Sequence, residues 1–410
     1  MNARRCYDLA ALAPNGLRRG YTTGTCAAAA VKAALGLLLR GLREPSVAVS
    51  LPDSDYFLTV PVQSVHWSAP GTAHAEVVKD GGDDPDNTHG ATLFASVSIN
   101  ARRALRFFAG QGVGTVTKPG LRVAVGEPAI NPMPRQMIRQ AIDEMLQESR
   151  MAALARRAFA ASTLVRQGGT TPPARPCETP GHADPGFDVF IGCIGGETIA
   201  RKTFNPRLGV VGGLSILGTT GIVEPMSLAA WMASIEVYIR VALSDRAPAI
   251  ALMPGKIGRE YARSVLGLPD ARSVQIANFV GPSLEFVQRT LVEAGRHLET
   301  LWLLSHPGKL VKVLNGYWDT HSSKSVMAMS AVARVAVECG ISRARVRHIE
   351  QANTMEEVVT ILSDDQLPAR QLWCEVERRI AALIRERAPR ADRVEVRLFD
   401  MQGLPLGAAA

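Results

Sequence analysis

Residues 208–227 of the chain read LGVVGGLSILGTTGIVEPMS, and this stretch decides the expected fold. Its first part, residues 208–217, is apolar and contains β-branched residues, as in a buried strand. The turn at residues 218–221 combines two glycines with two threonines. Because ligands bind at the carboxyl ends of strands in open α/β sheets, the stretch predicts a strand that ends in a ligand-binding turn. The alternative is an ordinary turn, in which the glycines only allow the backbone conformation and no ligand binds.

Downstream of this stretch, apolar runs that resemble strands alternate with amphipathic runs that resemble helices. Such alternation is typical of a parallel, doubly wound sheet with right-handed crossovers. A last run with period-two alternation predicts an edge strand at residues 393–399. We therefore expect a Rossmann-like C-terminal domain over residues 206–410. Its other strands are expected at 248–253, 274–279 and 297–304, and its helices at 227–243, 259–266, 283–294, 309–315, 323–339, 355–362 and 372–387.

Upstream of the stretch, the pattern changes to one long helix followed by closely spaced strands. Residues 26–40 are mostly Ala and Leu, which favour a helix. Residues 164–186 are rich in proline, glycine and threonine, which indicates a flexible insertion or linker. We expect an N-terminal mixed-sheet α/β domain over residues 1–205 with this Pro/Gly-rich insertion. Further strands are expected at 46–51, 56–65, 73–79, 97–108, 121–125 and 187–194, and a helix at 134–161.

The composition limits the class of protein. Of the 410 residues, 47% are hydrophobic and 20% charged, as in globular proteins. Lys and Arg outnumber Asp and Glu by 46 to 38, and the net charge of +8 favours an acidic partner. Nucleic acid is not expected, because the basic runs lack interleaved aromatic residues. No membrane span is expected either, since no uncharged apolar run reaches about 18 residues.

The six cysteines are scattered, without the close pairs of zinc-binding or redox motifs. With no convincing secretory signal, this pattern predicts a reduced, cytoplasmic protein. The phosphate-loop, dinucleotide-binding, nucleophile-elbow and zinc-protease motifs are also missing from the sequence. The oligomeric state stays open, with a homo-oligomer among the options.

Polar residues at three places suggest binding sites. Thr22, Thr23 and Thr25 precede the first helix, where free N–H groups can hold a carboxylate or phosphate, or where the hydroxyls simply cap the helix. Asp83, Asp84 and His89 share one short loop and could provide acid–base chemistry or bind a cation, unless the loop is only a rigid Asx-rich turn. The segment after the strand at 297–304 carries His306 and Lys309. His306 could contact a ligand, or it could be an ordinary histidine in a solvated loop.

Long ordered blocks of the sequence resemble one known family. They are GYTTGTCA at residues 20–27, GDDPDNTHG at 82–90, GVGTVTKPGL at 112–121, VGEPAINPMPRQMI at 125–138 and KTFNPRLGVVGGLSILGTTGIVEPMS at 202–227. These blocks resemble those of the cobalt-precorrin-5B C1-methyltransferase family (CbiD type) of anaerobic cobalamin biosynthesis. The resemblance spans most of the chain.

The resemblance implies an S-adenosylmethionine-dependent enzyme that methylates C1 of cobalt-precorrin-5B, a corrin precursor, and releases cobalt-precorrin-6A. Cobalt then enters only as part of the substrate, so no protein metal site is required. The acidic arms of the substrate would suit the basic protein. On this reading, Asp83, Asp84 and His89 are the catalytic candidates. The methyl donor is expected at Gly213, Ser215, Gly218, Thr219, Thr220 and Gly221, and the substrate at Thr22, Thr23, Thr25, Arg135, Lys202, Arg207, His306 and Lys309.

A protein of another class could share this scaffold. A non-catalytic tetrapyrrole carrier would bind the same macrocycle without a methyl donor. Binding of S-adenosylmethionine therefore separates the enzyme from the carrier.

Overall fold

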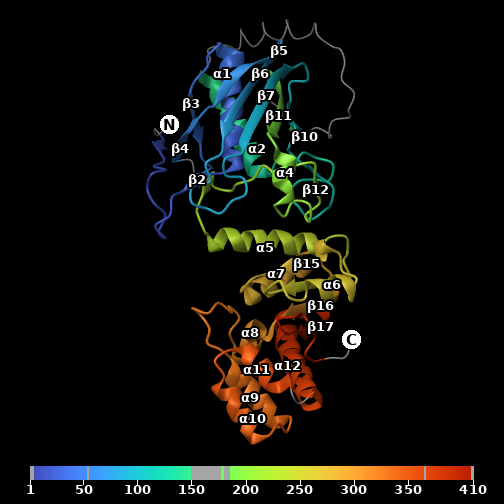
Figure 1. The fold of residues 1–410 in the computed structure, drawn as a ribbon. Coiled ribbons are helices and arrows are strands. Elements are labelled where there is room, and N and C mark those ends of the chain that lie inside the picture. Colours follow the sequence, from blue (N-terminus) through green and yellow to red (C-terminus); the bar gives the residue numbers. More distant parts are fainter. Residues whose placement is uncertain (1–3, 53–54, 149–176, 180–184, 364–365, 408–410) are drawn as a thin grey trace. The chain divides into compact units, whose positions relative to one another are not determined.

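The computed structural model describes residues 4–52, 55–148, 177–179, 185–363 and 366–407. It divides into two compact units, unit 1 over Met1–Leu228 and unit 2 over Ala229–Ala410 (Figure 1). The division differs from the expected domain boundary at 205/206, because residues 206–228 pair with strands and loops of unit 1. Both units mix helices and strands, so the expected α/β class is correct.

Helix α1 (Thr23–Arg40) forms the core of unit 1, close to the predicted residues 26–40. The Thr22 hydroxyl caps it by accepting the N–H of Thr25, and Gly41 ends it in the left-handed conformation. By length and composition, α1 is the one described helix that could cross a membrane, but 94% of its most apolar window is buried inside unit 1. Its apolar residues are therefore accounted for by core packing.

The main sheet of unit 1 is mixed, as expected. Its six strands run in the order β10-β8-β11-β7-β6-β5, and only β11 and β8 pair in parallel. A smaller sheet has the order β1-β4-β3. Helix α2 (Pro132–Glu148) packs against α1, and the rest of the predicted helix at 134–161 lies outside the described residues. The strands are β1 (Arg5–Cys6), β3 (Ser46–Ser50), β4 (Tyr56–Pro61), β5 (Ser64–Ala69), β6 (Thr72–Val78), β7 (Thr92–Asn100), β8 (Leu105–Ala109), β10 (Cys177–Thr179) and β11 (Gly186–Cys193).

Three of the predicted strands of unit 1 differ from the structure. The single strand expected at 56–65 is β4 followed by the start of β5, and the two lie in different sheets. The single strand expected at 97–108 is two strands, β7 and β8, separated by a turn in which Arg103 has a φ of 52°. The strand expected at 121–125 is absent, since residues 117–127 form turns and bends. Most of the proposed insertion lies outside the described residues, but its residues 177–179 form the edge strand β10.

The strand predicted at 208–217 is also wrong. Only β12 (Val210–Val211) is a strand there, and it pairs with β9 (Thr115–Val116) in unit 1. Gly212, with a φ of 90°, turns the chain out of the extended conformation. After the turn, Leu214 and Ile216 make only isolated bridges, and β13 (Ile222–Val223) pairs with β2 (Gly20–Tyr21). Residues 208–227 therefore pair with segments of unit 1 and do not form a strand of the predicted parallel sheet.

Unit 2 contains a parallel sheet of four strands in the order β15-β14-β16-β17. They are β14 (Ala249–Met253), β15 (Ser273–Gln275), β16 (Leu298–Ser305) and β17 (Ala391–Leu398). The predicted strands at 248–253, 274–279 and 297–304 are thus confirmed with shifted ends, and β17 is the expected edge strand. The sheet core includes Ile250, Leu301 and Val396, which are almost fully buried.

Helices connect and cover these strands. They are α5 (Leu228–Ala242), α6 (Arg259–Ser264), α7 (Val280–Glu293), α8 (Pro307–Leu310), α9 (Met329–Glu338), α10 (Arg343–Gln351), α11 (Met355–Ser363) and α12 (Gln366–Arg387), with 3-10 turns η1 (Asp270–Arg272) and η2 (Val311–Asn315). Helix α9 begins later than the predicted residue 323, since residues 321–324 form a turn in which Ser323 hydrogen-bonds with the His321 ring. Among the described residues of unit 1 there is one further short helix, α4 (Gly196–Arg201).

Candidate functional site

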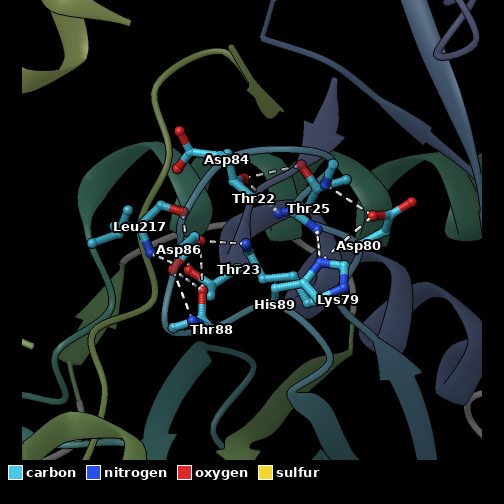
Figure 2. Close-up of polar contacts among 12 residues, drawn as sticks. Thr22, Thr23, Thr25, Lys79, Asp80, Asp84, Asp86, Thr88, His89 and Leu217 are labelled. Carbon is cyan, nitrogen blue, oxygen red and sulfur yellow. Dashed lines mark hydrogen bonds and ion pairs between the residues drawn. The ribbon is translucent and has the colours of Figure 1, made fainter. Parts of the chain in front are cut away.

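The threonine turn before α1 is closed by the loop at residues 217–221. The N–H of Gly24 donates to the carbonyl of Leu217, and the N–H of Thr22 donates to Gly221. The Thr25 hydroxyl donates to the same Gly221 carbonyl at 2.6 Å. Thr23 exchanges hydrogen bonds with the backbone of Leu217 (Figure 2). The structure thus favours the capping role over anion binding here, because the protein already occupies these groups.

Burial supports that assignment. Thr22, Thr23 and Thr25 are 7%, 3% and 0% exposed. The three expected substrate-binding hydroxyls therefore hold two distant segments of the chain together. A substrate arm would have to displace the loop at 217–221 to reach them.

The acidic loop of unit 1 is also bound internally. Asp83 accepts hydrogen bonds from the backbone and the side chain of Arg18, and these lower its pKa. Asp84 accepts the backbone N–H of Met226 at 2.8 Å. The partners of Asp83 and Asp84 are thus Arg18 and a backbone amide. Asx-turn hydrogen bonds also occur in this loop, from the N–H of Gly82 to Asp80 and from the N–H of Thr88 to Asp86, as the structural alternative predicts.

The most buried ion pair of this loop joins Lys79 and Asp86. Lys79 is 2% exposed, and its Nζ lies 2.5 Å from Asp86 Oδ2 (Figure 2). Thr88 donates to the same carboxylate from its N–H and its hydroxyl. Although burial raises the pKa of Asp86, Lys79 and Thr88 bring it below its usual range. Sequence reasoning missed Lys79, whose only signal is its position at the end of a strand before four carboxylates.

His89 remains accessible in this loop. Its Nδ1 accepts the N–H of Gly81 at 3.0 Å, and its side chain is 53% exposed. An Nδ1 that accepts a hydrogen bond leaves the proton of the neutral ring on Nε2. His89 can therefore donate a hydrogen bond to a ligand oxygen.

Most of the residues expected to bind the methyl donor face protein. A Cβ on Gly213 would lie 2.2 Å from the backbone of Gly112, and one on Gly218 would lie 2.4 Å from the Thr22 hydroxyl. A Cβ on Gly221 would meet Leu51 at 2.7 Å, so a bulky residue there would disturb the fold. Ser215 hydrogen-bonds with the buried Asn205. Thr219 and Thr220 are exposed, and the Thr220 hydroxyl exchanges hydrogen bonds with the backbone of Ile222.

Glycines also explain the motif around Gly112, which in the sequence resembles a simple turn. Gly112 has a φ of 75°, and a Cβ there would lie 2.0 Å from the Cys193 carbonyl. A Cβ added to Gly196 or to Gly213 would likewise lie 2.2 Å from the backbone of Gly112. Three backbone segments thus touch without side chains between them, which only glycine permits.

The basic residues expected to bind substrate in unit 1 differ in their availability. Arg135 is held by Glu127 at 2.9 Å and donates to two backbone carbonyls, so its guanidinium already has partners within unit 1. Lys202 is exposed at the end of α4. Arg207 lies over the ring of Phe204, with 5.4 Å from its Cζ to the ring centroid. Lys202 and Arg207 are the two that can meet a substrate arm.

Two further candidates lie in unit 2, at the carboxyl end of β16. His306 pairs with Glu356 at 2.9 Å and accepts the N–H of Gly308. Lys309 donates to the carbonyl of Pro254 at 2.5 Å and to that of Ala277 at 3.4 Å. His321 is exposed in a turn and bonds with Ser323. Within the described residues, no three His, Cys, Asp or Glu side chains come together as a metal site.

Comparisons with known proteins agree with the resemblance seen in the sequence. The family profile described as "CbiD" matches residues 11–170 and 174–225, and the profile "CbiD, C-terminal domain" matches residues 319–410. A protein of Ralstonia nicotianae named "Cobalt-precorrin-5B C(1)-methyltransferase" is 58% identical over 100% of this chain and 98% of its own length. A protein of Chromobacterium violaceum with the same name is 56% identical over 99% of both chains.

One similar solved structure is the crystal structure of a "cobalamin biosynthesis protein (cbiD) from Archaeoglobus fulgidus". It is 25% identical and covers 76% of this chain and 85% of its own, with a TM-score of 0.35. The two profiles and the full-length relatives carry the assignment without it. On these grounds, the chain belongs to the CbiD family.

Proposed function

We propose that the protein transfers a methyl group from S-adenosylmethionine to C1 of cobalt-precorrin-5B and forms cobalt-precorrin-6A, a step of cobalamin biosynthesis in the cytoplasm. The observation that carries this proposal is the 58% identity over the full chain to a relative that bears the corresponding name. The net charge of +8 suits a substrate with several carboxylate arms.

The chemistry requires little from ionisable residues. The methyl group moves from a sulfonium to a carbon, so the sulfur, the methyl group and C1 must be aligned. Holding the two reactants in this geometry can account for much of the acceleration. S-adenosylmethionine supplies the activated methyl group, while the residues of this chain orient the donor and the substrate and exclude water.

In unit 1, the proposal relies on the residues that remain accessible. Thr219 and Thr220 are exposed beside the threonine turn, and His89 presents a ring donor. Lys202 and Arg207 can pair with acidic arms. Asp84 keeps a candidate role, because only its Oδ1 receives the Met226 N–H.

Unit 2 supports the proposal by its topology. Its four strands are all parallel, and helices lie between them along the chain. We propose that it is a Rossmann-like domain that binds part of a ligand at the carboxyl edge of its sheet.

The decisive experiment incubates the protein with methyl-labelled S-adenosylmethionine and cobalt-precorrin-5B. Label in a macrocycle whose mass has risen by one methyl group supports the proposal. A protein that binds the macrocycle but neither binds S-adenosylmethionine nor transfers label is the non-catalytic carrier instead.

The acidic loop can be tested separately with Asp84→Asn. This change keeps the acceptor for the Met226 N–H but removes the charge. A role in the reaction predicts that turnover falls by at least about tenfold, while the melting temperature changes little. Asp400→Asn is the matched control, since Asp400 also accepts backbone N–H groups in a turn. Unchanged turnover with a lower melting temperature would assign Asp84 to structure alone.

A further inference from the structure

The order of strands in unit 2 marks one position on its sheet. From β14, the chain passes through α6 to β15 on one side, and then returns through α7 to β16 on the other side. The connections thus diverge between β14 and β16. In open α/β sheets, ligands bind beyond the carboxyl ends of the two strands at such a point.

Lys309 bridges the loops at this position. It follows β16, and its Nζ donates to the carbonyl of Pro254, which directly follows β14. Its second acceptor, the carbonyl of Ala277, follows β15. The ammonium group therefore lies where three carboxyl-end loops meet.

Lys312 places a second ammonium group close by. It is 5% exposed, and its Nζ donates to the carbonyl of Thr320 and to the hydroxyl of Ser325, each at 3.0 Å. Burial lowers the pKa of both lysines, and Lys312 lowers that of Lys309 further. The two positive charges thus repel each other in a partly desolvated place.

No carboxylate among the described residues forms an ion pair with either ammonium group. The acidic residues of the neighbouring loops have other partners, since Glu356 pairs with His306 and Asp319 pairs with Lys324. Carbonyl and hydroxyl oxygens satisfy hydrogen bonds but do not cancel the charge. Buried charges in proteins are normally paired, because an unpaired one is costly to desolvate.

A strained backbone supports the same location. Ala277, whose carbonyl receives Lys309, has a φ of 52°. Non-glycine residues rarely adopt this conformation, and those that do cluster at ligand-binding and active sites.

From this juxtaposition, we propose that Lys309 and Lys312 bind a carboxylate of a ligand at the point where the chain diverges between β14 and β16. If the proposed function holds, the carboxylate comes from one of two sources. It belongs either to the methionine part of S-adenosylmethionine or to an acetate or propionate arm of cobalt-precorrin-5B. Either carboxylate would supply the two ammonium groups with a negative charge, which no described residue provides.

Calorimetry on the full-length protein tests the proposal with three adenosyl probes and the macrocycle. S-adenosylmethionine and S-adenosylhomocysteine carry the amino-acid carboxylate, whereas 5'-methylthioadenosine lacks it. The variants are Lys309→Met and Lys312→Met, and Lys309→Arg retains the charge. Arg378→Gln removes a positive charge from an exposed pair on α12 and is the matched control.

A donor carboxylate predicts that both methionine variants weaken the two amino-acid-bearing probes at least about tenfold, as for the loss of a charged hydrogen bond. Binding of 5'-methylthioadenosine should then stay as in the wild type. A substrate arm predicts the same loss for cobalt-precorrin-5B, with the donor unaffected. Lys309→Arg should retain part of the affinity, and the control should retain all of it.

Equal affinities of wild type and methionine variants for every probe would overturn the proposal, whether the common affinity is high or absent. The proposed function is tested separately. If the wild-type protein transfers the methyl group although the lysine variants bind every probe as it does, the proposed function stands and only the carboxylate site is wrong. If one methionine variant does not fold, the other methionine variant provides the same comparison.

Discussion

The buried lysines of the two units differ in how their charge is neutralised. In unit 1, Lys79 lies 2.5 Å from Asp86, and Lys32 lies 2.7 Å from Glu144. In unit 2, the buried Lys312 has only a carbonyl and a hydroxyl as partners among the described residues. An internal ion pair stabilises the unit that contains it, whereas a buried charge without a counter-ion can be neutralised by a ligand. Lys79 and Lys32 thus help to hold unit 1 together, whereas Lys312 has the unneutralised charge expected of a binding site.

The largest effect is expected from breaking the ion pair of unit 1. Lys79→Met should destabilise the protein by about 3 kcal/mol, because Asp86 keeps its charge without a counter-ion in a largely buried position. Denaturant unfolding measures the change. In the double variant with Asp86→Asn, the loss should be smaller than the sum of the two single losses. Additive losses would show that the pair contributes no coupling energy.

Glycine packing provides a second contrast, between one tightly packed position in unit 1 and one open position in unit 2. Gly213→Ala should destabilise unit 1 by roughly 2–3 kcal/mol, because its Cβ would lie 2.2 Å from the backbone of Gly112. The matched control is Gly255→Ala in unit 2, where no atom lies within 4 Å of the added carbon. Thermal unfolding of both variants tests the prediction. Equal melting temperatures would mean that the three backbone segments in unit 1 separate without cost.

A buried carboxylate in unit 2 gives a contrast that depends on pH. Burial raises the pKa of Glu377 to about 7, and Arg397 at 3.7 Å opposes that rise only in part. The folded protein therefore holds this proton up to about pH 7, while the unfolded chain releases it near the ordinary value of 4.5. The stability associated with Glu377 is present at low pH and falls as the pH rises between these values.

Glu377→Gln should remove this dependence, since the amide does not titrate and can still accept the N–H of Leu398. Relative to the wild type, the variant should gain at most about 2–3 kcal/mol between pH 5 and pH 8. Denaturant unfolding at the two pH values measures the difference. Glu260→Gln, at an exposed pair on α6, is the control. Parallel pH profiles for wild type and Glu377→Gln would contradict the raised pKa.

The smallest effect on stability is expected at the unpaired lysine of unit 2. Lys312→Met should change the free energy of unfolding of the ligand-free protein by about 1 kcal/mol or less. Two lost hydrogen bonds are offset by removal of a buried charge that repels Lys309. A loss as large as that of Lys79→Met would show that Lys312 is a structural residue and would remove the difference between the units.

Local pattern predicted much of the fold. The Ala-rich composition of residues 26–40 and the threonines before it were sufficient for α1 and its cap, because both depend on neighbouring residues. The strands of unit 2 were also predictable, since an apolar run buried on both faces of a parallel sheet leaves a clear signal. The strand at 208–217 was wrong because pattern does not reveal that Gly212 turns and that its neighbours pair with β9.

The candidate site was less predictable for the same physical reason. Sequence alone identified the family, the α/β class, the basic charge and the polar loops, all of which are properties of residue type and order. Only the tertiary structure decided that Thr22, Thr23 and Thr25 close a loop and that Arg135 is held by Glu127. Likewise, only the tertiary structure showed that Lys79 pairs with the carboxylate of Asp86, whereas Lys312 has no carboxylate partner among the described residues. The charge of a lysine follows from its type, but whether that charge is neutralised depends on segments far along the chain.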